Sequence, residues 1–400
     1  MKKRKLIALL LAFVLTIGLA ACGNKPEEKP ESSAEPAPAE SSQDAEKPAP
    51  GKIAWDDNSL YLITDLGTID DKGFNQSAFE GLKMFADSVG VKANYLRPQA
   101  EGDQNYKQAI EQAIAKGAKV VVTPGFLFEN AVGQVQSEHP DVYFIAADFE
   151  PKVQDGDKVD DQGSPVMITK IDPNTAAILF KEQESGYLAG YAAVKDGYKN
   201  LGFMGGLAVP AVIRYGFGYV AGADAAAKEL NETVNVKYNY TNFFVPQPEI
   251  QTMAASWYNN GTEIIFSCGG GIVDSILKAA KENKGKVIGV DIDQYDLGEQ
   301  VITSAMKNLT VAVNDEIKLI DEGKFEGGKT MVFGVMENGI QLPDHFDRFQ
   351  KFTKDDYNAL FDALKSNKDG MTDAIPSSAE NSDPMSLQDQ FKNVKIEYIK

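Results

Sequence analysis

The chain is poor in the residues from which enzymes most often build acid–base, nucleophilic and metal sites. Its 400 residues include only two histidines and two cysteines. His139 stands before a proline and His345 after an aspartate, and neither has a cysteine or a second histidine close by in the sequence. Zinc sites usually need such neighbours, and both histidines lie in loop-like contexts that do not indicate a general base. We therefore expect a protein that is not an enzyme and that holds no metal and no cofactor.

A bound dinucleotide is not expected either. Gly216, Gly218 and Gly222 come close to the Gly-x-Gly-x-x-Gly pattern of dinucleotide-binding folds, but the last interval is one residue too long. In addition, no strand-like run ends just before these glycines, as that pattern requires.

Basic residues are scarce as well. The chain has 40 lysines and arginines against 58 aspartates and glutamates, which gives a formal net charge of −18 at pH 7. Beyond the first few residues the arginines are Arg97, Arg214 and Arg348. Because proteins that bind nucleic acid rely on a dense positive surface, we expect no nucleic acid partner. The hydrophobic content of 43% can bury a large core, and the length is typical of two domains.

The N-terminus has the pattern of a lipoprotein signal. Residues 2–5 are basic, residues 6–19 are almost wholly apolar, and small residues precede Cys22 in the sequence LAAC. This pattern predicts a signal peptide at residues 1–21 and a lipid on Cys22, which would hold the protein on the extracytoplasmic face of the cell membrane without a spanning helix. An ordinary secretory signal with an incidental cysteine is the alternative. The other cysteine, Cys268, is then unpaired, and no disulfide is expected.

The segment that follows Cys22 has a composition typical of disorder. Residues 23–51 are nearly all Pro, Glu, Ser, Ala and Lys, with no large apolar residue to bury. We therefore interpret residues 22–51 as the lipidated cysteine and a disordered tether. A lipid, a tether and a globular body are more typical of a surface receptor than of an enzyme.

From residue 60 onward, short β-rich runs alternate with helical patterns. The runs fall into two sets with similar spacing, which is the spacing of βαβ units with parallel strands. The first set is 60–63, 93–96, 120–122 and 142–146, and the second is 201–204, 234–238, 263–266 and 287–290. This repetition predicts an α/β fold with two similar Rossmann-like lobes, joined by a hinge of several segments, as in type I periplasmic binding proteins.

The lobe boundaries follow from the breaks in this pattern. Pro173 interrupts the pattern before a helical stretch, so residues 166–174 are predicted to be the first crossover. We expect one lobe to comprise residues 52–172 with 295–326, and the other residues 173–294 with 327–345. Residues 346–400 are an acidic C-terminal extension to which the sequence assigns no role.

The richest candidate for a binding loop is the stretch ITDLGTIDDKGFNQS, residues 63–77. It connects an apolar run to a helical pattern and brings acids, an aromatic ring and amides together. In open α/β sheets, ligands bind outside the carboxyl ends of the strands, where such loops lie. A solvated loop at a helix start is the alternative reading of this stretch alone.

Five stretches in the same order resemble the basic membrane protein family of lipoproteins. These are residues 63–82 (ITDLGTIDDKGFNQSAFEGL), 180–193 (FKEQESGYLAGYAA), 214–222 (RYGFGYVAG), the glycine run 269–271, and residues 289–294 (GVDIDQ) followed by TSAMKN at 303–308. The resemblance extends over roughly residues 58 to 340. Members of this family include purine nucleoside receptors that serve ABC transporters as substrate-binding components.

The resemblance implies a site for a purine nucleoside between the lobes. In the family, two aromatic residues, here Phe74 and Phe217, stack on the two faces of the base, and stacking is worth about 1 to 3 kcal/mol per base. Core packing is the alternative role for either phenylalanine. The resemblance also implies further site residues. They match family positions that hydrogen-bond the ligand or hold the ribose, or they lie in the same loops as those positions. These are Asp65, Asp71, Asn75, Asp148, Gly269, Asp291 and Lys307.

The remaining implications concern ligand class and partners. Several carboxylates and few cations would repel a nucleotide's phosphate but accept a neutral nucleoside. The expected partners are a nucleoside and the permease of an ABC transporter, with the protein acting as a monomer. A receptor for another neutral polar ligand, such as a sugar or an autoinducer, is the alternative function. The sequence departs from the family pattern at Ser267-Cys268 before the glycine run and in its longer acidic tail.

Overall fold

The structure is a computed structural model that describes residues 53–65 and 67–400. The predicted signal peptide, Cys22 and the predicted tether lie outside these residues. The described residues belong to one compact unit, Ala49–Lys400. No helix within them is long and apolar enough to cross a membrane.

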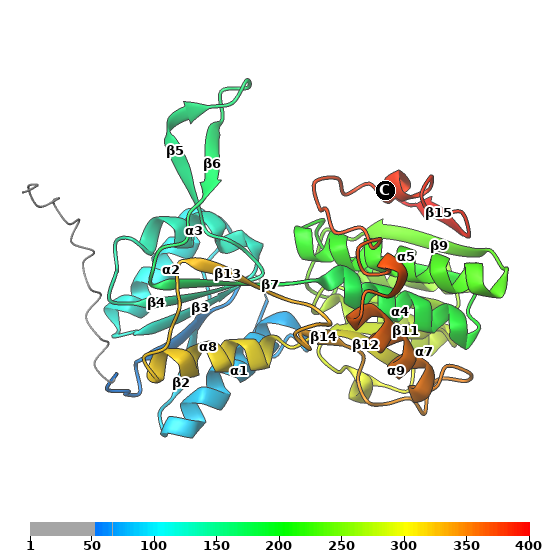
Figure 1. Cartoon of the computed structure of the whole chain (residues 1–400), viewed down its shortest axis with the longest axis horizontal. Helices are drawn as coiled ribbons and strands as arrows, with labels where there is room; N and C mark the ends of the chain where they lie inside the picture. Colours follow the sequence, from blue (N-terminus) through cyan, green and yellow to red (C-terminus); the bar gives the residue numbers. More distant parts are fainter. Residues whose placement is uncertain (1–52, 66) are drawn as a thin grey trace, which may run out of the picture. The chain divides into compact units, whose positions relative to one another are not determined.

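Lobe 1 is built on a six-stranded parallel sheet with the strand order β13-β7-β4-β3-β1-β2. Helices α1 and α8 cover one face and α2 and α3 the other (Figure 1). The strands are nearly continuous apolar runs, as expected for strands buried on both faces. The elements of this lobe are β1 (Leu60–Ile63), α1 (Phe74–Val89), β2 (Ala93–Leu96), α2 (Asp103–Ala115), β3 (Val120–Pro124), η1 (Phe126–Phe128), α3 (Glu129–Val135), β4 (Tyr143–Ala147), β7 (Thr175–Phe180), α8 (Leu309–Asp321) and β13 (Lys329–Phe333).

Lobe 2 has a seven-stranded sheet with the order β14-β12-β11-β10-β8-β9-β15, parallel except for β14. Its elements are α4 (Glu182–Asp196), β8 (Asn200–Gly205), α5 (Pro210–Leu230), β9 (Val234–Tyr240), α6 (Pro248–Asn259), β10 (Ile264–Cys268), α7 (Ile272–Asn283), β11 (Lys286–Asp291), η2 (Tyr295–Leu297), β12 (Val301–Lys307), β14 (Ile340–Gln341), α9 (Lys354–Lys365), η3 (Lys368–Gly370), η4 (Pro384–Leu387) and β15 (Val394–Tyr398). A separate antiparallel hairpin, β5 (Lys152–Val159) and β6 (Pro165–Thr169), extends from lobe 1 (Figure 1).

All eight strands predicted from the sequence are present within a few residues of their expected positions. The α/β fold with two parallel-sheet lobes is confirmed as well.

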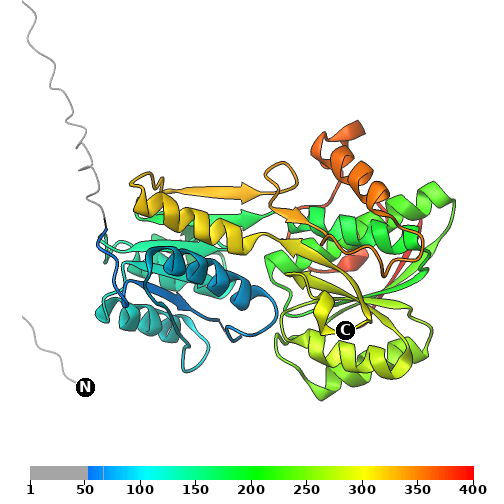
Figure 2. The ribbon, with the colours of Figure 1, turned by 90° about the horizontal axis from the view of Figure 1, so that it is seen from below.

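The lobe boundaries differ from the prediction. The first crossover follows Phe180, not residues 166–174, because Thr175–Phe180 forms β7 and pairs with β4 in lobe 1. Strand β12 lies in lobe 2 although residues 295–326 were assigned to lobe 1, and β13 lies in lobe 1 although residues 327–345 were assigned to lobe 2. Figure 2 shows α8 and β13 (gold and orange) in the lobe that also holds α1 (blue). For β7 the physical reason is that its apolar run leads directly into α4, so the pattern does not separate the end of the strand from the start of the helix.

The C-terminal residues are part of lobe 2 and not a separate extension. Strand β15 pairs in parallel with the outer edge of β9. The Asp196 carboxylate accepts hydrogen bonds from the backbone N–H groups of residues 350, 351 and 352 at 2.6, 2.6 and 3.0 Å. Leu387 and Ile396 are buried in the main core. The last segment therefore covers a sheet edge that would otherwise expose unpaired backbone groups.

Helices α4 and α5 pack with their backbones in close contact. A Cβ atom on Gly186 would lie 2.1 Å from the carbonyl oxygen of Tyr215, and one on Gly190 would lie 2.1 Å from that of Tyr219. Only glycine fits at these two positions. This packing explains why GYLAGYAA and GFGYVAG occur together, and it fixes where the N-terminal half of α5 presents its side chains.

Candidate functional site

A cavity lies at the carboxyl ends of strands from both sheets. Its volume is about 80 Å³, several times the roughly 10–15 Å³ that one water molecule needs. The lining combines apolar and aromatic side chains with a few acids, which is typical of a small-molecule site. The lining residues are Asp65, Gly67, Asp71, Phe74, Asn75, Gly125, Phe126, Leu127 and Asp148 from lobe 1, and Val209, Ala211, Val212, Tyr215, Phe244, Cys268, Gly269, Gly270, Val290, Asp291 and Lys307 from lobe 2.

The structure brings together every site residue expected from the sequence except Phe217. Phe217 lies inside α5, is 4% exposed and packs in the main core, so it is neither in a loop nor at the cavity. Residues that are two positions apart along a helix, such as 215 and 217, point to nearly opposite sides. For this reason Tyr215, not Phe217, is the residue of the RYGFGYVAG stretch that lines the cavity.

The loop before α1 is held by its own acids and amide. The Asp71 carboxylate accepts hydrogen bonds from the backbone N–H groups of Gly73, Asn75 and Gln76 at 2.9, 3.1 and 3.1 Å, and so caps the helix. The Asn75 side-chain amide donates to Asp71 at 2.9 Å and to Asp65 at 2.8 Å. Burial raises the pKa of Asp65 to about 6 and also raises the pKa of Asp71. These contacts fix the position of Phe74 at the first turn of α1.

Lys307, at the end of β12, is surrounded by carboxylates. Its ammonium contacts Asp148 directly and lies 3.7 Å from Glu182 and 3.6 Å from Asp291. Arg214 donates to the other oxygen of Glu182 at 2.6 Å. The group thus contains three acids and two bases, all largely buried.

The pKa shifts in this group follow from burial and charge. Burial lowers the pKa of Lys307, but the three carboxylates outweigh burial and hold that pKa above its ordinary value. Burial raises the pKa of Asp148 to about 7, with Lys307 opposing the rise and Glu182 and Asp291 adding to it. Burial also raises the pKa of Asp291.

Two of these acids occupy matching places in the two lobes. Asp148 directly follows β4 and Asp291 ends β11, and both have a left-handed backbone, with φ of 65° and 67°. Non-glycine residues rarely adopt this conformation, and such strain tends to occur at functional sites. In both lobes the strained turn directs a carboxylate into the cavity.

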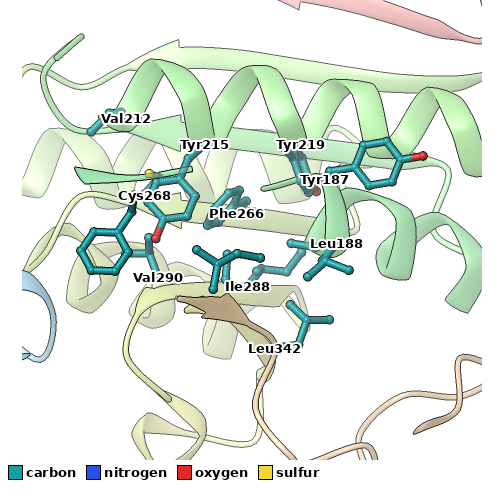
Figure 3. Close-up of a cluster of buried hydrophobic side chains, with 14 of the residues drawn as sticks. Tyr187, Leu188, Val212, Tyr215, Tyr219, Phe266, Cys268, Ile288, Val290 and Leu342 are labelled. Carbon is teal, nitrogen blue, oxygen red and sulfur yellow. The ribbon is translucent and has the colours of Figure 1, made fainter. Parts of the chain in front are cut away.

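Lys307 also links the acids to an aromatic face. Its nitrogen lies 4.3 Å from the ring centroid of Phe74, within the range of a cation–π contact. Figure 3 shows Tyr215, Cys268 and Val290 close together beside the core of lobe 2. Burial raises the pKa of the Cys268 thiol well above its ordinary value, so this thiol stays protonated and unreactive.

Within the described residues the chain passes between the lobes three times, near the cavity. These connections follow Phe180, Lys307 and Phe333, and they are bonded to one another. The N–H of Lys181 donates to Phe333 at 2.9 Å, and the N–H of Asn308 donates to Gly339 at 2.8 Å. Lys307 is thus both a cavity residue and the residue before a crossover. A hinge of a few short segments permits closure of two lobes around a ligand.

Sequence reasoning missed Glu182 and Arg214. Both lie in stretches that were recognised, but they meet only because α4 and α5 pack face to face. It also missed one group that could bind a metal ion, Glu111, Glu138 and His139. In that group the ammonium of Lys107 already contacts Glu138 at 2.9 Å, and we assign no role to it.

The chain matches a known family over most of its length. The family model for PnrA-like ABC transporter substrate-binding proteins, Bmp, matches residues 59–370. A Listeria innocua protein named CD4+ T-cell-stimulating antigen is 28% identical, with 87% of this chain and 93% of the relative covered. A Lactococcus lactis protein named ABC transporter nucleoside-binding protein BmpA is 28% identical, covering 73% and 83%. A 25% identical protein from Pyrococcus abyssi, covering 74% and 72%, is named an uncharacterized lipoprotein.

A solved structure shows the same fold. The ABC transporter solute-binding protein of Aeropyrum pernix superposes with a TM-score of 0.68 at 21% identity, covering 82% of this chain and 96% of that one. The two-lobed α/β fold is therefore that of a type I solute-binding protein. The chain belongs to the Bmp family of PnrA-like ABC transporter substrate-binding proteins, whose members bind solutes for transport and are not enzymes.

Proposed function

We propose that the solute is a nucleoside, with a purine as the preferred base, and that the protein captures it in this cavity for uptake by its ABC transporter. The observation that carries the proposal is the pairing of an aromatic face with a charged pocket. Phe74 offers a flat ring for a base, and Asp291 and Lys307 offer an acceptor and a donor for sugar hydroxyls. The name of the Lactococcus lactis relative supports the same ligand class.

Each end of the cavity fits one part of a nucleoside. Asp65 and Asn75 lie in the Phe74 loop, where they can hydrogen-bond the edge of a base stacked on that ring. An ionised Asp291 can accept from both hydroxyls of a vicinal diol at once. The surrounding acids disfavour a phosphate group, because the buried cluster holds three acids, Asp148, Glu182 and Asp291, and only two bases.

We further infer that a lipid on Cys22 holds the protein on the outer face of the cell membrane and that it acts as a monomer. The lipid anchor is supported by the LAAC pattern after an apolar run and by the lipoprotein name of the Pyrococcus relative. In this arrangement residues 23–51 would let the binding unit reach a permease in the same membrane.

A thermal-shift screen tests the proposed ligand class. The purified protein would be melted with purine and pyrimidine nucleosides, free bases, nucleoside monophosphates and free sugars. A ligand present at a hundred times its dissociation constant should stabilise the fold by about 2.7 kcal/mol. We expect this shift with purine nucleosides and not with monophosphates or ribose. A shift with sugars alone would establish the alternative receptor function and refute the proposal.

A further inference from the structure

We propose that the hydroxyl of Tyr215 is a binding group for a hydroxyl of the ligand's sugar, next to Asp291 and Lys307. The proposal rests on the nucleoside function above, because it assigns one more contact in the same cavity. It goes beyond that function by giving this single oxygen atom a part in discriminating between sugars.

The first observation is a buried hydroxyl without a partner. Tyr215 lines the cavity and is 1% exposed, and its hydroxyl makes no hydrogen bond with any described residue. Three other buried tyrosines, at 106, 198 and 219, also lack a partner, but Tyr215 is the tyrosine that lines the cavity. A buried hydroxyl left unpaired is costly. A bound ligand could supply the missing partner.

The second observation is that the ring cannot easily turn away. The backbone of Tyr215 is held against Gly186 of the neighbouring helix. Its ring packs edge-on against Phe266, with centroids 5.9 Å apart and planes at 88°. Figure 3 shows the Tyr215 ring flanked by Cys268 and Val290. The position of the hydroxyl is therefore fixed before a ligand arrives, which reduces the entropic cost of binding.

The third observation is that the Tyr215 ring lies near the charged groups of the cavity. The ammonium of Lys307 lies 5.8 Å from the centroid of the Tyr215 ring. Burial raises the pKa of Tyr215 well above its ordinary value, and among the charged groups Asp291 adds most to the rise. The hydroxyl is therefore neutral at physiological pH and can both donate and accept. A sugar hydroxyl has the same dual capacity, whereas Asp291 only accepts and Lys307 only donates.

The test is a pair of conservative substitutions in the full-length protein. Tyr215→Phe removes only the oxygen atom. Tyr219→Phe is the matched control, because Tyr219 lies one turn further along α5, is equally buried and also has an unpaired hydroxyl, but does not line the cavity. Melting temperatures would verify that both variants fold.

The affinities of wild type and both variants would be measured by titration calorimetry with adenosine and its 2'-, 3'- and 5'-deoxy analogues. We expect Tyr215→Phe to weaken adenosine binding by about 5- to 150-fold, the range for an unpaired buried partner. One of the three analogues lacks the hydroxyl that contacts Tyr215. For that analogue, Tyr215→Phe and the wild type should have nearly equal affinities. Tyr219→Phe should bind all four ligands as wild type does.

Three results would overturn the inference. If Tyr215→Phe binds every ligand within about twofold of wild type, the hydroxyl has no role in binding. If it weakens all four ligands equally, the hydroxyl does not contact a sugar hydroxyl. If the wild-type protein binds neither adenosine nor any other nucleoside, the proposed function fails and this inference fails with it. The first two results, in contrast, refute the role of Tyr215 while the wild-type protein still binds nucleosides, so the two failures can be told apart.

Discussion

The substitution Lys307→Met tests the charge balance at the centre of the site. Methionine keeps the apolar stem of the side chain and removes the ammonium group. In the structure that ammonium contacts Asp148 and lies within 3.7 Å of Glu182 and Asp291, and the Lys307 residue is 3% exposed. The substitution leaves three buried carboxylates with only Arg214 to offset them.

The expected loss of stability is large. Removing one partner of a buried ion pair costs about 3 to 5 kcal/mol, because the remaining charge stays buried without compensation. With an unfolding entropy of about 2.1 cal/mol/K per residue, a folded unit of this size loses about 1.4 °C per kcal/mol, so the melting temperature should fall by roughly 4 to 7 °C. The matched control is Lys324→Met, since Lys324 is 69% exposed and its pair with Glu322 at 2.8 Å lies on the surface. Such pairs are worth only about 0 to 1 kcal/mol.

The pH dependence gives a second readout. Lys307 lowers the pKa of Asp148, which burial raises to about 7, so the pKa should rise further in the variant. An aspartate in the unfolded chain has a pKa of about 3.9. Because the pKa of Asp148 is higher in the folded protein than in the unfolded chain, its charged form destabilises the fold above the folded pKa. Stability returns as the pH falls from the folded pKa towards the unfolded pKa, since the folded protein then takes up the proton first.

Differential scanning calorimetry at about pH 8.5 and about pH 5.5 would therefore show a larger deficit of Lys307→Met at the higher pH than at the lower one. Melting of Lys307→Met within 1 °C of Lys324→Met at both pH values would refute this description of the cluster. A deficit that grows as the pH falls would refute the assigned direction of the pKa shifts.

Four further predictions concern single residues. Phe74→Ala should weaken nucleoside binding by about 1 to 3 kcal/mol in calorimetric titrations, with little change in melting temperature. Phe217→Ala should instead lower the free energy of unfolding by about 3 to 5 kcal/mol, because its ring is in the core. Loss of binding without loss of stability in Phe217→Ala would restore Phe217 to the site. Asp291→Asn should lower affinity at least about tenfold and bind ribonucleosides and 2'-deoxynucleosides with nearly equal weakness, and a retained preference for ribose would assign the diol to another residue. Cys268 should react with iodoacetamide far more slowly than a free thiol in a mass-shift assay, because burial raises its pKa; labelling at the rate of a free thiol would show that the site is open. Cys22→Ala should move the protein out of the membrane fraction on cell fractionation, and membrane retention with an unchanged mature mass would contradict the lipid anchor.

The sequence was sufficient to locate most strands of the fold. Strands such as β3 and β11 are short apolar runs between amphipathic helices, and their spacing identifies parallel βαβ units. It was insufficient for β7, which runs directly into the start of α4, so the first crossover was placed too early. Strand β15 could have been found, because Val394, Ile396 and Tyr398 alternate with Lys395 and Glu397, the pattern of a strand with one buried face.

The site was predictable where a residue follows a strand, and less so elsewhere. Asp148 and Asp291 come directly at strand ends, and the topology of parallel sheets places such residues at a common edge. Phe217 was misplaced because its neighbour Tyr215 faces the cavity instead, which depends on the rotation of α5. The pair Glu182 and Arg214 depends on the packing of two helices, which no local pattern encodes.

The most direct test of the proposed function is a calorimetric titration of the wild-type protein with a purine nucleoside, its 5'-monophosphate and free ribose. The cavity combines the ring of Phe74 with a cluster in which acids outnumber bases. We predict one nucleoside bound per protein, binding of the monophosphate weaker by at least about tenfold, which corresponds to about 1.4 kcal/mol, and no measurable binding of ribose. Equal or tighter binding of the monophosphate, or binding of ribose without binding of the nucleoside, would contradict it.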